Sequence, residues 1–158
     1  FRSKYREHGL CLVQKIPTPI TPIEIDHKAR HITLAYFEQK STVDYIGAAQ
    51  GVPICFDAKE SAVDTFRLAN VHPHQVAFMR EFEAQDGVAF FLLYYTHRDL
   101  FCYLPFSRFL TFWERGERGG RKSFRFEELD MSYRILPREG VMVPYLDMVK
   151  KELEGRRD

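Results

Sequence analysis

The sequence predicts an α/β domain, and three features of its hydrophobic pattern support this class. Residues 88–95 form an unbroken apolar run, which is typical of a strand buried on both faces of a sheet. Residues 43–48 and 52–59 are β-prone and flank a short turn that contains a glycine. Residues 73–83 repeat apolar side chains at helical spacing. The chain has 158 residues, enough to bury one core, so we expect a single domain over residues 1–158.

We expect the N-terminal part of the chain to form a core strand and then a segment that projects from the core. Residues 5–9 have the pattern of a helix end that stops at a glycine, and residues 10–16 have that of a strand. Prolines then interrupt regular pairing, and two short β-prone runs flank a polar tip. Those runs are residues 23–25 and 32–37. We therefore expect a projecting two-stranded arm at about residues 19–37.

The C-terminal half continues the alternation of strands and helices. In chain order we expect a turn at 96–99, a strand at 100–104, a helix that carries Phe106, Phe109, Leu110 and Trp113, a glycine-rich basic loop at 115–122, and a helix at 144–155. The aromatic stripe on the first of these helices is expected to lie in the core or in a dimer interface.

Composition excludes some classes of protein and restricts others. The net charge is only +1, so any nucleic-acid surface has to be local. Cys11, Cys55 and Cys102 are far apart and odd in number, which argues against a disulfide framework and fits a reducing cytoplasm. The longest apolar run is too short to cross a bilayer, and we see no signal peptide. Because the sequence begins with Phe1, we expect it to be a trimmed product.

The residues whose pattern predicts chemistry are Asp44, Asp57 and Lys59. Asp44 stands at the start of one strand of the expected hairpin, and the other two stand near the end of its partner. Because side chains alternate along a strand, Asp57 and Lys59 share one face with Cys55. The opposite face is apolar and suits a core. We therefore expect a half-buried strand whose polar face is open for chemistry.

Two carboxylates beside an ammonium are the groups that a phosphodiester-cutting metal site needs. A divalent cation polarises the phosphoryl oxygen and lowers the pKa of water. Mg²⁺ takes oxygen ligands, usually including one or two carboxylates, which Asp44 and Asp57 would supply beside the backbone carbonyl of Ala58. Lys59 would orient the attacking water or stabilise developing charge. On spacing alone, the alternative is a surface hairpin whose charged side chains are merely solvated.

Several further motifs, in order along the chain, resemble the RecU family of Holliday junction resolvases. The resemblance extends over about residues 5–133 and is carried by residues 14–20, 35–37, 41–45, 56–60, 72–75, 85–87, 112–113 and 120–123. It implies a restriction-endonuclease-like core, that is, a mixed central β-sheet flanked by helices. It also implies a protruding β stalk, at about residues 19–37, that enters the junction centre.

The same resemblance implies an activity and its requirements. It implies a Mg²⁺-dependent endodeoxyribonuclease, with Mn²⁺ as a substitute, that resolves Holliday junctions by paired symmetric cuts in DNA recombination and repair. A homodimer follows, because two matched cuts need two identical sites. The implied partners are four-way junction DNA, a RecA-type recombinase and RuvAB-type branch-migration proteins. The implied location is the bacterial cytoplasm, for a cellular or phage-encoded protein with no membrane partner.

Roles carry over to this chain residue by residue. Asp44 matches the family's first metal carboxylate, and Lys59 matches its catalytic lysine. Asp57 falls where the family usually has Glu, so the carboxylate is kept on a side chain one methylene shorter. Thr42 and Gln75 match positions near the metal. His72 and His74 are expected at a helix start beside the site, because their one-residue spacing is a poor zinc signature.

Candidate DNA contacts are expected at both basic and aromatic positions. They are Lys15, Arg30, Tyr36, Phe37, Arg121 and Lys122. The first two match basic positions linked to junction binding in the family, and the last two lie in a loop that could follow a phosphate backbone. The aromatic pair could stack on unpaired bases. The alternative is a solvated charge for each basic residue, and a core or dimer contact for the aromatic pair.

Two other functions fit the same residues. The shorter side chain of Asp57 suits a junction-binding protein whose cutting is weakened and which modulates recombination machinery. A nuclease of the same fold that acts on flaps or plain duplex is the other alternative. Binding without product, and competition between junction and linear duplex, would distinguish these from a resolvase.

Overall fold

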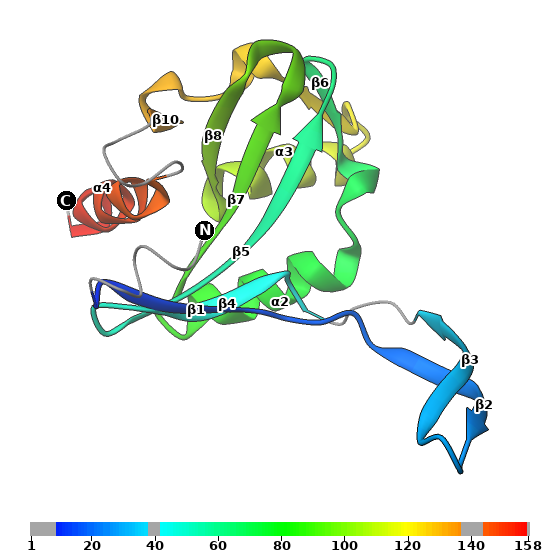
Figure 1. The fold of residues 1–158 in the computed structure, drawn as a ribbon. Coiled ribbons are helices and arrows are strands. Elements are labelled where there is room, and N and C mark those ends of the chain that lie inside the picture. The colour runs from blue at the N-terminus through cyan, green and yellow to red at the C-terminus, as the bar shows by residue number, and fades with distance from the viewer. Residues whose placement is uncertain (1–8, 38–41, 137–143, 158) are drawn as a thin grey trace.

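A six-stranded mixed sheet forms the centre of the computed structural model, which describes residues 9–37, 42–136 and 144–157 (Figure 1). The strand order is β1-β4-β5-β7-β8-β10. Only β5 and β7 are parallel, and the other neighbouring pairs are antiparallel. The strands are β1 (Cys11–Lys15), β4 (Tyr45–Ala49), β5 (Val52–Ser61), β7 (Val88–Tyr95), β8 (Leu100–Pro105) and β10 (Arg134–Ile135). The two longest strands, β5 and β7, therefore lie in the middle.

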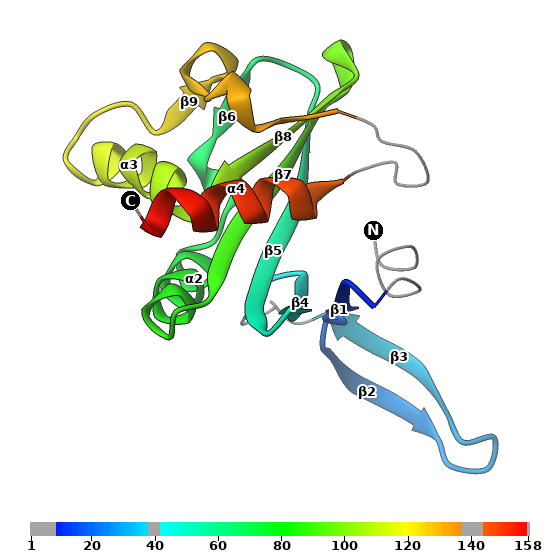
Figure 2. The same ribbon diagram turned by 90° about the vertical axis from the view of Figure 1, so that its left-hand side faces the viewer.

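Within the described residues, three α-helices cover the two faces of this sheet (Figure 2). Helices α2 (Pro73–Ala84) and α3 (Phe106–Glu117) pack on the face that includes Cys55. Helix α4 (Tyr145–Arg157) packs on the opposite face, and Tyr145 lies against Phe56. Helices on both faces bury most of β7 and the middle of β5. This arrangement confirms the predicted architecture of a mixed sheet flanked by helices.

An aromatic ladder crosses the sheet on the face covered by α4. The ring centroids of Tyr45 and Phe56 lie 4.7 Å apart, those of Phe56 and Phe90 4.8 Å, and those of Phe90 and Tyr103 4.4 Å. The four residues belong to β4, β5, β7 and β8, so the ladder connects four neighbouring strands. Stacked rings at this spacing add about 0.5–1.5 kcal/mol per pair beyond their buried area. The ladder thus holds fixed the strands that carry the site.

A hairpin and a projecting arm account for most of the N-terminal half. The turn between β4 and β5 places Gln50 at φ 50° and Gly51 at φ 83°, the left-handed conformation that glycine favours in a two-residue hairpin. The arm pairs β2 (Ile20–Asp26) with β3 (His31–Phe37) and points away from the core in Figures 1 and 2. Both strands were predicted, although β2 begins earlier than the expected run.

Neither face of the arm is buried. The large apolar side chains of the arm whose burial the structure describes are between 42% and 58% exposed; they are Ile20, Ile23, Ile25, Ile32, Leu34 and Tyr36. Strands β2 and β3 contact mainly each other, and the register shifts between Pro22 and Ile25. An apolar two-stranded projection of this kind is typical of a surface that meets a partner.

Several smaller elements complete the chain. A second two-stranded sheet joins β6 (Thr65–Arg67) to β9 (Ser123–Arg125), and the sequence pattern did not predict it. Short 3-10 helices connect the larger elements; they are η1 (Leu68–Asn70), η2 (Thr96–Arg98), η3 (Phe126–Glu128) and η4 (Met131–Tyr133). None of the described helices is long and apolar enough to cross a membrane.

Two sequence-based expectations were wrong in detail. Strand β5 is not half-buried, because helices cover both of its faces and Cys55, Phe56 and Asp57 are all 0% exposed. Helix α3 continues to Glu117, so the first part of the expected glycine-rich loop is helical. The expected helix end at residues 5–9 falls almost wholly outside the described residues; Gly9 alone is described, with φ 67°. The aromatic residues Phe106 and Phe109 are core residues, as one alternative predicted.

We predict that the core folds without the arm. Replacing residues 20–37 with a short Gly-Ser turn should leave the melting temperature within about 2 °C of wild type, because the arm buries little against the core. Circular dichroism melting curves provide the measurement. A large loss of cooperativity in the shortened protein would contradict the prediction and would make the arm part of the folding unit.

Candidate active site

The hairpin between β4 and β5 brings the two predicted carboxylates together. The last pair of its register joins Tyr45 to Phe56, and one further step places Asp44 opposite Asp57. Residues directly opposite each other in an antiparallel pair point to the same face. The backbone N–H of Asp44 donates to Oδ1 of Asp57 at 2.6 Å. Asp57 therefore accepts a hydrogen bond at the point where regular strand pairing ends.

Asp57 is enclosed by three donors. Besides the Asp44 amide, Nε2 of Gln75 donates to its Oδ2 at 3.1 Å, and Nζ of Lys59 lies 3.4 Å from the same oxygen. The side chain of Asp57 is 0% exposed, whereas that of Lys59 is 22% exposed. Lys59 follows Asp57 by two residues on β5, so alternation places both on the face that α2 covers. The ammonium group thus connects the buried carboxylate to the surface.

The site concentrates negative charge in a buried place. Burial raises the pKa of Asp57, and the neighbouring charge of Asp44 raises it further. The Asp44 amide and the Lys59 ammonium offset only part of this rise in pKa. Two carboxylates that repel each other at a buried position favour a third, positive group between them.

Gln75 is fixed in place by the start of α2. Its Oε1 accepts from the backbone N–H of His72 at 3.2 Å, and its backbone N–H donates to the His72 carbonyl at 3.0 Å. These contacts leave Nε2 of Gln75 to reach Asp57 and, at 3.4 Å, the carbonyl of Thr42. The rings of His72 and His74 stack at 5.3 Å and 8°. Through the Gln75 side chain, the start of α2 therefore holds the Asp57 carboxylate in position.

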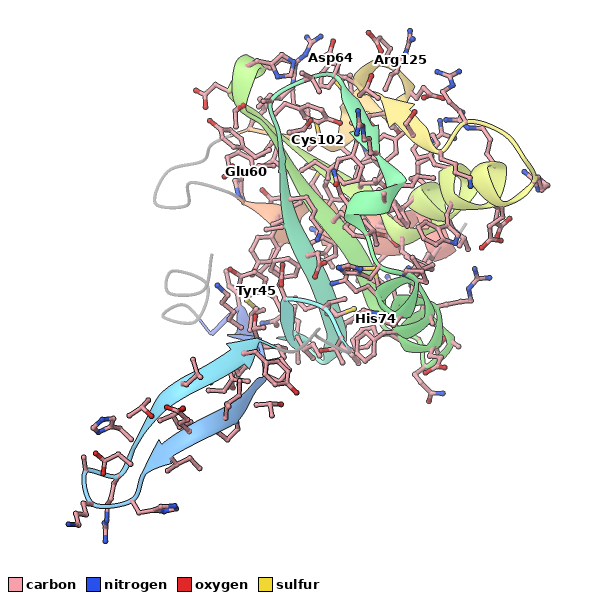
Figure 3. All side chains as sticks on the ribbon, turned by 90° about the vertical axis from the view of Figure 1, so that its right-hand side faces the viewer. Tyr45, Glu60, Asp64, His74, Cys102 and Arg125 are labelled. Carbon is pink, nitrogen blue, oxygen red and sulfur yellow. The ribbon has the colours of Figure 1, made fainter. Side chains whose placement is uncertain are left out.

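Figure 3 shows how this end of the molecule is arranged. Tyr45 and His74 both lie at the end of the core from which the arm projects. Glu60, which sequence alternation places on the face opposite Asp57, lies further along β5 and is exposed. The paired acids are thus close to the base of the arm.

The donor set fits a hard divalent cation. Asp44 and Asp57 supply two carboxylates, and β5 runs beyond the last β4 pair at Phe56, so Ala58 has no partner on that side in the β4 register. Mg²⁺ commonly binds one or two carboxylates and completes its octahedron with water and phosphate. In residues 9–37, 42–136 and 144–157, no three His, Cys, Asp or Glu side chains form a metal-holding group. The fit therefore rests on the carboxylate pair.

Lys15 and Thr42 are two further residues that the sequence predicts at or near the site. Lys15 ends β1 opposite Tyr45, and the backbone N–H of the next residue, Ile16, donates to the Asp44 carbonyl at 2.7 Å. Lys15 is exposed, and because it lies opposite Tyr45 its side chain is on the face of the sheet that α4 covers, opposite Asp57. The Thr42 hydroxyl donates to the Val43 carbonyl at 3.5 Å and makes no described bond to either carboxylate.

The aromatic and basic candidates on the arm lie at its two ends. Arg30 is at the arm tip with φ 58°, and Tyr36 on β3 is 52% exposed, which excludes a core role for this ring in the described chain. The backbone of Phe37 pairs with Ile20. Arg121 and Lys122 are exposed in the loop between α3 and β9.

The basic loop is anchored by Arg115. Its Nη1 donates to Oε1 of Glu128 at 2.6 Å, and its Nη2 donates to the carbonyl of Ser123 at 2.7 Å. Glu128 also accepts from the backbone N–H of Arg125 at 2.8 Å. The hydrogen bond from Arg115 is the main cause that lowers the pKa of Glu128 to about 2. These contacts close the loop that carries Arg121 and Lys122 against the end of α3.

Sequence reasoning missed one signal that was present. A two-residue turn fixes the register of a hairpin, so the turn at Gln50 and Gly51 already implies that Asp44 lies opposite Asp57. The capping role of His72, and the amide that Gln75 directs at Asp57, carried no local signal. They depend on how α2 crosses the sheet.

Comparison with known proteins identifies the family. A family model described as "Recombination protein U" matches residues 2–151. The protein from Limosilactobacillus reuteri (strain DSM 20016) named "Holliday junction resolvase RecU" is 38% identical over 157 residues, which cover 96% of this chain and 77% of that protein. The protein of the same name from Lactococcus lactis subsp. lactis (strain IL1403) is 39% identical over 155 residues, 95% of this chain and 72% of that protein. The chain therefore belongs to the RecU family.

A solved structure with some similarity is that of Archaeoglobus fulgidus Hjc, described as a Holliday junction resolvase from an archaeal hyperthermophile. The match covers 66% of this chain and 69% of the Hjc chain, with 8% sequence identity and a TM-score of 0.41.

We predict that Mg²⁺ stabilises the protein through Asp57. With Mg²⁺ well above its Kd, the melting temperature of wild type should rise by about 2–6 °C over its value in EDTA. Asp57→Asn, which keeps the shape and removes the charge, should lose most of this rise. Differential scanning fluorimetry provides the measurement. Glu60→Gln, an exposed change on the same strand, is the control and should keep the rise; equal rises in all three proteins would contradict the assignment.

We predict that the Arg115–Glu128 pair stabilises the protein in a pH-dependent way. Because the pKa of Glu128 is lowered on folding, its contribution is present above the unfolded value of about 4.3 and is lost as the pH falls towards about 2. Arg115→Met should therefore lower the free energy of unfolding by about 1 kcal/mol at neutral pH and by less near pH 2.

Urea denaturation at several pH values checks the Arg115→Met prediction. Arg118→Met, which alters an exposed arginine of the same loop region, is the matched control. A difference between Arg115→Met and wild type that does not change between neutral pH and pH 2 would assign the effect to packing rather than to charge.

Proposed function

We propose that this protein is a Mg²⁺-dependent, structure-selective endonuclease that resolves Holliday junctions. The observation that carries the proposal is the buried carboxylate of Asp57, held opposite Asp44 with Lys59 beside it. Its relatives, 38% and 39% identical over most of the chain, carry the name Holliday junction resolvase. A cleaving centre and a junction substrate are together the simplest account of both facts.

Asp44, Asp57 and the carbonyl of Ala58 would hold the cation, with Mn²⁺ as a substitute for Mg²⁺. When bound, the cation polarises the phosphoryl oxygen and lowers the pKa of water. Because both acids come from one rigid hairpin, their oxygens are placed before substrate arrives. Gln75 acts through Asp57: its amide orients the carboxylate and limits its rotation.

Lys59 would supply a positive charge from the protein itself, in addition to that of the cation. Its ammonium is anchored 3.4 Å from Oδ2 of Asp57, and its side chain is partly exposed. From this position it can donate to an attacking water or to a non-bridging phosphate oxygen as negative charge develops. Donors that are fixed in place before the reaction stabilise a transition state strongly, often by 10²–10³-fold in rate for one hydrogen bond.

Two matched cuts require two matched sites. A homodimer with two-fold symmetry would present two copies of the Asp44–Asp57 centre to opposing strands. The arm, exposed on both faces and projecting from the same end of the core, would enter the junction centre. Lys15 at the end of β1, Arg30 at the arm tip and the Arg121–Lys122 loop would contact phosphates. Selectivity would then come from DNA shape.

One observation favours a second candidate, a junction-binding protein with weakened cutting. Asp57 stands where the family usually has Glu, and here it is 0% exposed and shared among three donors. A shorter, fully enclosed carboxylate has less freedom to reach a cation at the surface. Binding of junctions would remain, because the basic and aromatic candidates do not depend on Asp57.

We predict that cutting depends on the carboxylate pair and the lysine. With a labelled four-way junction and Mg²⁺, wild type should produce symmetric nicks, and Asp44→Asn or Lys59→Ala should reduce the rate by about 100-fold or more. Asp57→Glu should retain cutting, because it restores the residue usual in the family. Glu60→Gln is the matched control and should cut like wild type. Fluorescence anisotropy in EDTA should give similar junction affinities for all five proteins.

The outcomes separate the candidates. Tight binding without product in wild type, with product appearing in Asp57→Glu, would favour the weakened binder. Equal cutting of junction and linear duplex in a competition assay would favour a nuclease that acts on another DNA structure, such as plain duplex. Unchanged nicking by Asp44→Asn and Lys59→Ala would contradict the assigned centre.

A further inference from the structure

A cavity of about 690 Å³ lies beside the candidate active site, between the start of α2 and the end of α3. Six of the residues that line it are Arg67, Leu68, Val71, Trp113, Gly116 and Lys122. They come from β6, η1 and the segment after it, α3, and the loop before β9. Leu68, Val71 and Trp113 belong to the hydrophobic layer on the face of the sheet that contains Asp57. The volume is within the range of small-ligand sites, about 300–1,000 Å³.

Trp113 gives this cavity an oriented aromatic wall. Its Nε1 donates to Oε1 of Glu117 at 2.7 Å, and its ring packs on Phe109 with centroids 5.9 Å apart. The ring is therefore held at its polar edge and by one neighbouring ring, and it is only half-buried. Gly116 lets α3 approach Leu68 closely, because a Cβ there would lie 3.3 Å from Cδ1 of Leu68. A flat ring could lie against Trp113 without moving the core.

The rim of the cavity is positively charged. Arg67 and Lys122 are exposed at its edge, and neither forms an ion pair with any residue that the structure describes. The backbone N–H of Leu68 donates to the carbonyl of Lys122 at 3.1 Å, which fixes the two sides of the rim relative to each other. Glu117 is the acidic neighbour, and its carboxylate accepts from the Trp113 indole. An aromatic wall with a cationic rim matches a base joined to its phosphate.

The cavity is connected to the carboxylates through one turn of helix. His72 and Pro73 line it, and His72 also caps the turn in which Gln75 donates to Asp57. A DNA strand whose phosphate lies at Asp57 and Lys59 would therefore pass the mouth of the cavity within a short distance. Strands at a branch point contain bases that have lost a stacking neighbour, and such bases are the easiest to turn out of the helix.

We propose that the cavity receives one unstacked base of the DNA strand that is cut, next to the phosphate held at Asp57 and Lys59. The base stacks on Trp113, and its phosphate is held by Arg67 and Lys122. This inference rests on the proposed nuclease function and adds a position where junction shape is sensed. A branch point that releases a base fills the cavity, whereas a fully stacked duplex leaves it empty.

The chain has a single tryptophan, so its fluorescence reports on this cavity directly. In EDTA, titration of the protein with a four-way junction should quench Trp113 emission in step with binding measured by anisotropy. The junction is then made with an abasic residue at each position flanking the cut in turn. Abasic substitution at one of these positions should abolish quenching and weaken binding by about 10-fold, the size expected for one lost stacked base.

Variants test the residues separately. Arg67→Ala and Lys122→Ala change exposed side chains, keep the fluorophore and should require more junction for the same quenching. Trp113→Leu should bind the junction about 10-fold more weakly, and Trp113→Phe, which keeps a ring, should restore much of this loss. The anisotropy of Trp113→Phe keeps the test valid if Trp113→Leu does not fold.

The outcomes distinguish this inference from the proposed function. Saturating binding and normal cutting with unchanged Trp113 emission would overturn the base-binding cavity and leave the nuclease intact. Equal quenching by all abasic junctions, or quenching by free deoxynucleoside monophosphate but not by the junction, would also overturn it. Absence of both binding and cutting would overturn the cavity together with the function on which it rests.

Discussion

The arrangement of this protein depends on one buried carboxylate. Asp57 is 0% exposed at the centre of the sheet, and its two oxygens accept from the Asp44 amide and the Gln75 side chain. A buried charge is tolerated only where donors surround it, so the hairpin register, the start of α2 and Lys59 must all be correct at once. A substitution in any of these elements would therefore affect the Asp57 carboxylate.

The sheet provides the rigidity that such a group needs. The aromatic ladder from Tyr45 to Tyr103 fixes four neighbouring strands on one face, while α2 and α3 cover the other. Burial and the neighbouring charge of Asp44 together raise the pKa of Asp57. A rigid site with two neighbouring carboxylates is suited to a cation that arrives with its substrate.

In the proposed function, chemistry belongs to the centre of the molecule and recognition of DNA to its periphery. The arm contacts mainly itself, and the basic loop is closed by Arg115 on Glu128 and Ser123. Neither set of contacts includes the carboxylates, which suits selection of DNA by shape. The cavity at Trp113 is lined in part by the basic loop and shares His72 with the turn that positions Asp57. It is the place where recognition and cutting would be coupled.

Local pattern determined much of this protein. Alternation placed Asp57 and Lys59 on one face, prolines and β-prone runs gave the arm, and the turn at Gln50 and Gly51 implied the register that pairs Asp44 with Asp57. Only the tertiary structure decided that Asp57 is fully enclosed and that Gln75, 18 residues later, turns its amide towards it. Alternation and turn length are properties of neighbouring residues, whereas burial depends on which distant helix covers a face.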